Sequence, residues 1–325
     1  MYNILAAIKP TAEEEKEIHL ATKKVLQQIH IPHARLLLGG SYAKHTWLRG
    51  NCDIDIFVQF DYTRYKDKSD SLSDILERYL KKLHPERLHG SRDYFRIQQG
   101  HILFEIVPIL KIRKADQAKN ITDISPLHTL WVKKHRKEDE IRLTKAFARA
   151  QHIYGAESYI QGFSGYVLEI LTIHYGSFLK LVKSASRWKK KTILDPEHHL
   201  HNALFELNEA KTASPLILVD PVDKTRNAAA ALSKEKCLLF IKKCKAHVKN
   251  PSANFFRFQS PRIPKGAVIF TFPLTGKKDS TAGKYFALFN RLKKQLVLRE
   301  FVLQRSGFVV AEDIRLWFLF RSDRL

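Results

Sequence analysis

The sequence predicts a multidomain α+β protein, and three observations support this fold class. The chain has 325 residues, which is more than one small core usually contains. Its first third alternates apolar strand patterns with helical patterns, whereas its middle third is mostly helical in pattern. A hydrophobic fraction of 44% with 11% aromatic residues is enough to build these cores, so the chain is not disordered.

The first domain is expected to end near residue 115. Thr11 precedes a run of acidic residues and then a helical periodicity that continues to about residue 30. Further along, we expect strands at "ARLLLGG" and "DIDIFVQF", a helix at "LSDILERYLKKLH", and two strands around a Gly100 turn in "YFRIQQGHILFEIVPIL". This order predicts a small domain built on a mixed sheet, over residues 1–115.

Two further domains are expected, at residues 116–215 and 216–325. From Ser125 the helical patterns "SPLHTLWVKKHRKEDEIRLTKAFARAQHIYG" and "FSGYVLEILTIHYGSFLKLVKSASRW" predict a largely helical middle domain. The last domain should contain a strand at "PLILVD", a Pro-rich turn, and a helix opened by Ser233. A strand "AVIFTFP", a flexible loop "TGKKDSTAGK", a long helix to about residue 305, and the strand pair "FVVAED" and "RLWFLF" complete it.

The charge balance indicates a polyanionic partner. The chain carries 56 Lys and Arg against 33 Asp and Glu, a formal net charge of +23 that is spread along its length. Nucleic acid is the first candidate and an anionic membrane surface the second. Cys52, Cys237 and Cys244 have no Cys-x-x-Cys spacing, which argues against a zinc site and favours a reducing compartment. With no signal-peptide pattern and no apolar run of ~20 residues, we expect a cytoplasmic protein and no membrane contact.

Three acidic residues form a candidate metal site. Asp53 and Asp55 are two residues apart in a strand, so they share one face while Ile54 and Ile56 point into the core. Glu105 is a lone acid in the otherwise apolar strand "ILFEIVPIL", where burial is costly without a cation or a partner. If the two strands are neighbours, the three carboxylates converge as two-metal phosphoryl transfer requires.

A glycine turn just ahead of these acids is a candidate phosphate site. Gly39 and Gly40 would let the backbone approach a ligand, and "SYAKHTWL" could begin a helix whose free N–H groups face phosphate oxygens. Ser41 would add a hydroxyl and Lys44 a positive charge. Taken alone, Gly-Ser fits an ordinary turn from strand to helix better than a phosphate site, and its place just ahead of Asp53 and Asp55 reverses that preference.

Together these residues resemble a known family. "GGSYAKHTWLRGNCDIDIFVQF" is similar to the signature of the nucleotidyltransferase superfamily that includes DNA polymerase beta. More narrowly, the chain resembles the archaeal, class I CCA-adding tRNA nucleotidyltransferases in "SPLH", "IYGAESYIQGFSGYVLEILTIHYGSF", "ASRWKKKTILD" and "VDPVDKTRNAAAALS". The resemblance implies a polymerase beta-like catalytic head with a mixed β-sheet, a helical neck that binds nucleotide, and an α/β body that binds RNA. It also implies addition of CCA to tRNA from CTP and ATP with two Mg²⁺ ions.

The resemblance also implies roles for individual residues. The metal ligands and catalytic residues would be Asp53, Asp55 and Glu105, and the contacts to the triphosphate would be Gly40, Ser41 and Lys44. Further contacts to the nucleotide would come from His128, Lys145 and Tyr154. The residue that selects the base would be Arg226. Glutamate is common in the family where Asp53 stands, aspartate where Glu105 stands, and arginine where Lys44 stands. Family members are also usually longer, so the C-terminal tail that grips tRNA is expected to be absent. Whether the protein forms a homodimer stays open.

Three other functions compete with this one. A poly(A) polymerase shares the catalytic head but would extend RNA without stopping. A nucleotidyltransferase that modifies small molecules would have little use for a net charge of +23. A catalytically inactive tRNA-binding protein would bind RNA with strong salt dependence and turn over no nucleotide.

Overall fold

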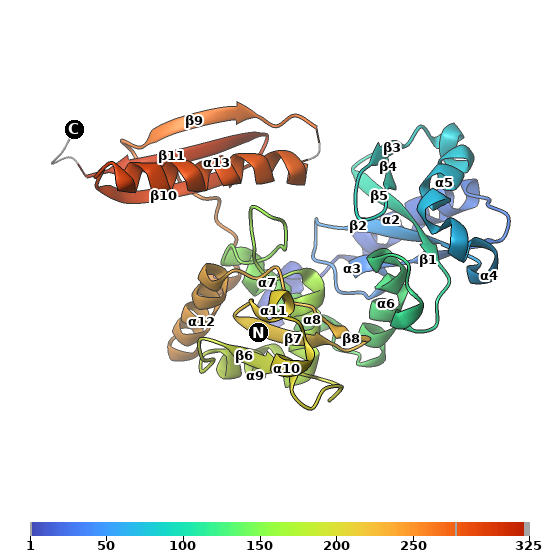
Figure 1. Ribbon diagram of the computed structural model, residues 1–325, viewed down its shortest axis with the longest axis horizontal. Helices are drawn as coiled ribbons and strands as arrows, with labels where there is room; N and C mark the ends of the chain where they lie inside the picture. Colours follow the sequence, from blue (N-terminus) through green and yellow to red (C-terminus); the bar gives the residue numbers. More distant parts are fainter. Residues whose placement is uncertain (1, 277, 322–325) are drawn as a thin grey trace.

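The computed structural model describes residues 2–276 and 278–321 and has the expected α+β architecture. Figure 1 shows the larger sheet with its helices at the right, a helical part below, and a small sheet carrying a long helix at the upper left. Within the described residues, none of the helices has the length and apolar character that a membrane span requires.

The N-terminal part is built on a mixed sheet, with strands in the order β1-β2-β5-β4-β3. Its elements are α1 (Tyr2–Ile8), α2 (Ala12–Gln28), β1 (Ala34–Leu38), α3 (Gly40–Ala43), β2 (Asp53–Phe60), α4 (Tyr62–Tyr65), α5 (Leu72–Leu80), β3 (Glu86–Leu88), β4 (Tyr94–Gln99) and β5 (Ile102–Leu110). The central strands β2 and β5 run parallel, and all other neighbours are antiparallel. The strands predicted at 53–60 and 102–110 are therefore neighbours.

One face of this sheet is covered by α2 and α5. Ile54, Ile56 and Val58 of β2 are fully buried in one cluster with the apolar side chains of the two helices. The first helix begins as predicted, because Thr11 accepts a hydrogen bond from the Glu14 N–H at 3.2 Å. By the two-residue strand period, Asp53 and Asp55 lie on the opposite face, where the turn at Gly40 lies against Asp55.

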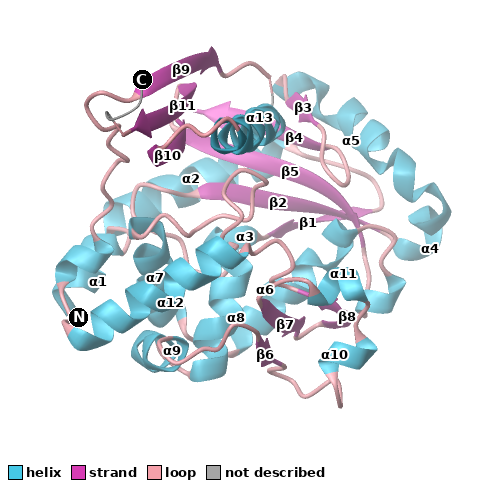
Figure 2. Ribbon diagram, turned by 60° about the vertical axis from the view of Figure 1, so that its left-hand side comes forward, coloured by secondary structure: helices cyan, strands magenta, loops and turns pink. Residues whose placement is uncertain are grey.

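The middle part is helical and carries a small three-stranded sheet in the order β6-β7-β8. Its elements are α6 (Ser125–Lys134), α7 (Glu138–Ala150), α8 (Gly165–Tyr175), α9 (Phe178–Ala185), β6 (Thr192–Leu194), α10 (Ala203–Glu206), α11 (Glu209–Thr212), β7 (Leu216–Asp220), β8 (Asp223–Asn227) and α12 (Lys234–Lys249). One hydrophobic cluster joins α7, α8 and α9 with β7 and α12, so its members come from both sides of residue 215. Figure 2 shows these helices below the larger sheet.

The C-terminal part consists of β9 (Val268–Pro273), α13 (Lys278–Leu298), β10 (Leu303–Val310) and β11 (Asp313–Phe320). The strands form an antiparallel sheet in the order β10-β11-β9. Phe289 of α13 packs on Phe318 of β11, with ring centroids 5.4 Å apart, so the helix covers one face of this sheet. The predicted order of strand, helix and strand pair is confirmed.

Several predicted elements differ in extent. The helix expected to start at Ser41 has only four residues, because the chain turns at His45, whose φ is +53°. The segment expected to be a turn after "PLILVD" continues into β8. The loop predicted at 275–284 was wrong for residues 278–284, which open α13, while residue 277 lies outside the described residues. There the Thr281 hydroxyl donates to the Thr275 carbonyl at 2.6 Å and joins the helix to the preceding turn.

Candidate active site

The three predicted carboxylates come from neighbouring strands of the larger sheet. Asp53 and Asp55 lie on β2, and Asp55 is directly opposite Glu105 in the parallel register of β2 and β5. Glu105 in turn accepts a hydrogen bond from the Arg96 guanidinium at 2.9 Å, from the next strand, β4. The adjacency that the sequence predicted is thus present, and a cation already contacts one member.

On the sheet face that carries Asp53, Asp55 and Glu105, the surroundings disfavour ionisation of a second carboxyl group. Burial raises the pKa of Asp55 to about 7, with a further contribution from Glu105, while Lys44 acts in the opposite direction. Burial also raises the pKa of Asp53. A carboxylate pair whose ionisation is suppressed in this way becomes more favourable when a cation binds between its members.

The donor set fits a divalent metal such as Mg²⁺. Carboxylate oxygens are the ligands that Mg²⁺ prefers in proteins, and Asp53, Asp55 and Glu105 provide three carboxylates on one sheet face. In the described part of the chain, no three Asp, Glu, His or Cys side chains are already arranged to hold an ion. Arg96 contacts Oε1 of Glu105 when no ion is bound, and we expect a metal to take its place.

The raised pKa of Asp55 makes a prediction about stability without metal. Its pKa of about 7 lies above the ~4 of an unfolded aspartate, so ionisation at this position destabilises the fold. This loss of folding free energy is absent below pH ~4, grows between pH ~4 and ~7, and is complete above pH ~7. In EDTA, Asp55→Asn should therefore raise the melting temperature at pH 8 and leave it nearly unchanged at pH 4. A variant that melts lower than the wild type at pH 8 would contradict this crowding of charge.

Gly40 brings the glycine turn directly against Asp55. Its φ is +58°, and a Cβ atom placed on it would lie 1.6 Å from Oδ2 of Asp55. The backbone of the same turn is fixed by a hydrogen bond from the Gly39 N–H to the Asp55 carbonyl at 2.8 Å. Glycine is therefore required at position 40 both by the left-handed backbone and by the neighbouring carboxylate. Ser41 follows in this turn, and its carbonyl accepts from the Thr46 N–H at 3.0 Å.

Two of the predicted lysines share one buried carboxylate. Lys44 Nζ lies 2.6 Å from Oε2 of Glu169, and Lys145 Nζ lies 2.7 Å from Oε1 of the same residue. The Thr46 hydroxyl donates to Glu169 at 3.0 Å and accepts from Lys145 at 2.9 Å. Burial acts to raise the pKa of Glu169, but Lys145 and Lys44 outweigh it and bring it to about 2. Tyr154 lies close to this cluster too, since a Cβ atom placed on Gly165 would be 3.0 Å from the Tyr154 hydroxyl and 3.8 Å from Lys145 Nζ.

The remaining predicted residues meet at a second buried carboxylate, Asp220. Its oxygens contact His128 Nε2 at 3.1 Å and accept hydrogen bonds from the Tyr166 hydroxyl at 3.1 Å and the Arg226 guanidinium at 2.6 Å. His128 also stacks on Tyr166, with ring centroids 4.0 Å apart. Burial opposes ionisation of Asp220, yet its hydrogen bond and charge interaction with His128 lower its pKa to about 2.

The carboxylates, the lysines and the Asp220 cluster are continuous in space. Lys44 lowers the pKa of Asp55 on one side and lies 6.0 Å from the Tyr166 ring centroid on the other. Tyr166 then leads to His128 and Arg226 through Asp220. The structure thus brings together residues from positions 40 to 226 of the chain in one row of charged and polar side chains.

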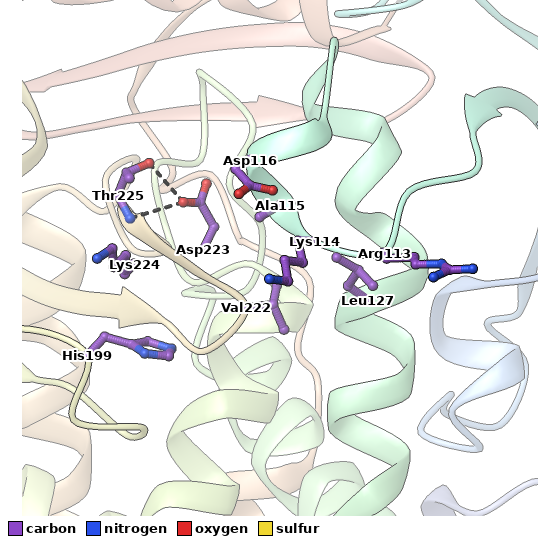
Figure 3. Close-up of a pocket in the computed structure, with 10 residues that line it drawn as sticks. All are labelled: Arg113, Lys114, Ala115, Asp116, Leu127, His199, Val222, Asp223, Lys224 and Thr225. Atoms are coloured by element: carbon purple, nitrogen blue, oxygen red, sulfur yellow. Dashed lines mark hydrogen bonds between the residues drawn. The ribbon is translucent and has the colours of Figure 1, made fainter. Parts of the chain in front are cut away.

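A cavity of about 540 Å³ lies next to the end of this row. Its walls include Arg113, Lys114, Leu127, His199, Val222 and Thr225 (Figure 3). Leu127 and Thr225 are the chain neighbours of His128 and Arg226, whereas none of the three sheet carboxylates lines the cavity. The cavity is therefore lined by the chain neighbours of the predicted nucleotide contact His128 and the predicted base-selecting residue Arg226, and none of the three sheet carboxylates reaches it.

Sequence reasoning missed Thr46, Arg96, Tyr166, Glu169 and Asp220. Glu169 carried the same signal as Glu105, since it is a lone acid in the apolar helix "GYVLEILTIHY". Asp220 ends the buried strand "LILVD" and carried a weaker signal of the same kind. Both are fully buried, where a carboxylate requires partners.

The fold and the site define a nucleotidyltransferase. Residues 21–128 match the family described as "Nucleotidyltransferase domain", and residues 139–257 match "tRNA nucleotidyltransferase, second domain". Among solved structures, Cid1, described as an RNA terminal uridylyl transferase, has a TM-score of 0.62 at 14% identity and covers 80% of this chain and 98% of its own. A cytoplasmic RNA terminal U-transferase has a TM-score of 0.60 at 13% identity, covering 80% of this chain and 97% of its own. These likenesses concern the fold.

Relatives in the sequence comparison identify one family among the nucleotidyltransferases. A CCA-adding enzyme of Saccharolobus shibatae is 35% identical over 326 residues, covering 97% of this chain and 74% of the relative. The CCA-adding enzyme of Nanoarchaeum equitans is 44% identical over 258 residues and that of Methanosarcina acetivorans 35% over 288 residues. The matches cover 74% and 85% of this chain and 64% and 62% of the two relatives, respectively. The chain belongs to the family of CCA-adding enzymes.

Proposed function

We propose that this chain adds the nucleotides C, C and A to the 3′ end of tRNA, using CTP and ATP and releasing pyrophosphate. The observation that carries the proposal is that Asp55 lies against Gly40, at the start of the short turn that leads to Lys44. Lys44, which is held by Glu169, lies close enough to Asp55 to lower its pKa. A triphosphate needs both groups, because cations neutralise its oxygens and carboxylates hold its metal ions.

Each cluster has a separate task in the proposed reaction. Asp53, Asp55 and Glu105 would hold the Mg²⁺ ions, and Arg96 would balance Glu105 when no ion is bound. Bound ions would supply charge neutralisation and a more acidic RNA 3′-hydroxyl. The protein itself would then act by positioning the hydroxyl and the α-phosphate in line.

The nucleotide would lie along the row of charged residues. Its phosphates and sugar would be contacted by four residues, Ser41, Lys44, Lys145 and Tyr154. Two of them, Lys44 and Lys145, are adjacent at Glu169. Arg226 and His128 are both oriented by Asp220, so their donors would present a fixed pattern to the base edge. The fixed pattern is what allows the protein to choose between CTP and ATP without a nucleic acid template.

The RNA substrate is supported by charge. The formal net charge of +23 would attract a polyanion as large as tRNA and make binding depend strongly on salt. A small-molecule nucleotidyltransferase would gain nothing from this excess. We therefore favour tRNA as the partner.

The proposal can be tested with a tRNA transcript that lacks its last three nucleotides. The protein, Mg²⁺ and labelled CTP or ATP are incubated singly and together, and the products are sized at single-nucleotide resolution. We expect two additions with CTP alone, one further addition when ATP is also present, and then arrest. A long homopolymer tail would assign the chain to another RNA-tailing activity. Binding of tRNA without any extension would contradict catalysis.

A further inference from the structure

Glu169 occupies a position that the proposed reaction does not by itself explain. The side chain is completely buried on α8 and contacts groups from two other parts of the chain. Lys44 is 125 residues away in sequence and follows α3 of the larger sheet, whereas Lys145 is 24 residues away on α7. One carboxylate thus fixes the separation of two ammonium groups that belong to different parts of the fold.

The cluster has an unbalanced charge. Lys44 and Lys145 are 8% and 3% exposed, so, leaving aside the sheet carboxylate Asp55 near Lys44, two buried cations share one buried anion at Glu169. A buried charge without a partner is costly, and the remaining positive charge favours an anionic ligand. Each ammonium carries three N–H donors. Among the described residues, Lys44 donates one of its hydrogen bonds to Glu169, and Lys145 donates to Glu169 and Thr46, which leaves donors on both lysines for a ligand.

We propose that Glu169 is a positioning residue for the nucleotide triphosphate: it holds Lys44 and Lys145 at one fixed spacing so that both ammonium groups contact the same phosphate chain. This inference rests on the proposed function, because it needs a nucleotide at the lysines. Without the carboxylate, the two ammonium groups repel each other and no longer converge. Charge-assisted hydrogen bonds depend strongly on such geometry.

The test compares triphosphate with monophosphate binding in the full-length chain. The affinities of CTP and CMP are measured by calorimetry with Mg²⁺ present and RNA absent, so no reaction occurs. The wild type should prefer CTP, and Glu169→Gln should lower the ratio of the two affinities roughly 10-fold or more, because the lysine contacts concern the phosphates that CMP lacks. A substitution that only unfolds a fraction of the protein molecules would lower the apparent number of binding sites and leave the ratio of the CTP and CMP affinities unchanged.

A matched control comes from another buried ion pair. Asp123 is as buried as Glu169 and pairs with Arg92, whose side chain is 4% exposed, and neither side chain of this described pair hydrogen-bonds to Lys44 or Lys145. Asp123→Asn should lower the melting temperature, as loss of a buried pair does, and should leave the preference for CTP intact. If Glu169→Gln does not fold, Glu169→Asp replaces it. Its carboxylate is one methylene shorter and cannot reach both lysines, so the ratio should still fall several-fold.

The outcomes separate this inference from the proposed function. A wild-type protein that binds CTP no better than CMP would overturn both. A wild-type preference that persists in Glu169→Gln or Glu169→Asp would overturn the positioning role alone. Tighter binding of CTP by Glu169→Gln would also overturn it, because Glu169 would then be a competitor of the phosphates rather than their organiser.

Discussion

Asp55→Asn should abolish nucleotide addition while tRNA binding stays nearly intact. Asp55 is the carboxylate that faces Glu105 in the strand register and whose pKa responds to Glu105, Asp53 and Lys44 together. An amide cannot supply the negative charge that a divalent ion needs, so the single-turnover rate of CTP addition should fall on the order of 10³-fold or more, which is ~4 kcal/mol of activation free energy.

The control for this substitution is an aspartate outside the row of charged residues. Asp70 is exposed, so Asp70→Asn changes the net charge by the same amount and should leave addition unchanged. Fluorescence anisotropy with labelled tRNA reports binding for all three proteins. Activity of Asp55→Asn within a factor of a few of the wild type would show that the carboxylates of β2 do not hold the reacting metal.

Gly40→Ala should have the second-largest effect, although it adds only one methyl group. The new Cβ would lie 1.6 Å from Oδ2 of Asp55, so either the turn or the carboxylate must move. A displacement of about 1 Å at a reacting centre costs on the order of 10²-fold in rate, and we expect a loss of at least that size. The measurement is again single-turnover addition of CTP to tRNA.

Gly50→Ala separates the steric effect from the backbone effect. Gly50 has a φ of +68°, similar to the +58° of Gly40, but no atom lies within 4 Å of its Cβ position. Both alanine variants therefore carry a left-handed alanine, which costs on the order of 1 kcal/mol of stability, and only one of them disturbs Asp55. Equal activity of the two variants would contradict the close packing of Gly40 on Asp55.

The carboxylate face could be predicted from sequence because its signals are local. The two-residue period of a strand puts Asp53 and Asp55 on one face, and a lone acid in an apolar strand marks Glu105. The parallel register then sets Asp55 opposite Glu105. The predicted roles of these residues in holding metal stay predictions until the variants are measured.

The partners of the nucleotide contacts could not be predicted in the same way. Lys44 and Lys145 both look like surface residues in sequence, and only the packing of α7 and α8 against the segment after α3 buries them at Glu169. The same holds for His128 and Arg226, which lie on different elements and meet at Asp220. Contacts between residues so distant in the chain depend on how whole elements pack, which neither periodicity nor capping patterns encode.

The short helix after the glycine turn illustrates a different limit. Residues 41–48 contain good helix formers, yet α3 ends at Ala43. The reason lies outside the segment. Lys44 and Thr46 both donate hydrogen bonds to Glu169, and the chain turns between them at His45, whose φ is +53°. Tertiary contacts override the local propensity here.

The most direct test of the site is to locate a divalent ion beside the nucleotide. Crystals of the protein are soaked with Mn²⁺ and a nonhydrolysable CTP analogue, and anomalous scattering at the manganese edge locates the metal. We expect a peak within coordination distance of the carboxylates of Asp53, Asp55 and Glu105, with Arg96 released from Glu105 and the phosphates against Lys44 and Lys145. A nucleotide and metal bound elsewhere, with the Arg96–Glu105 pair intact, would contradict this assignment of the active site.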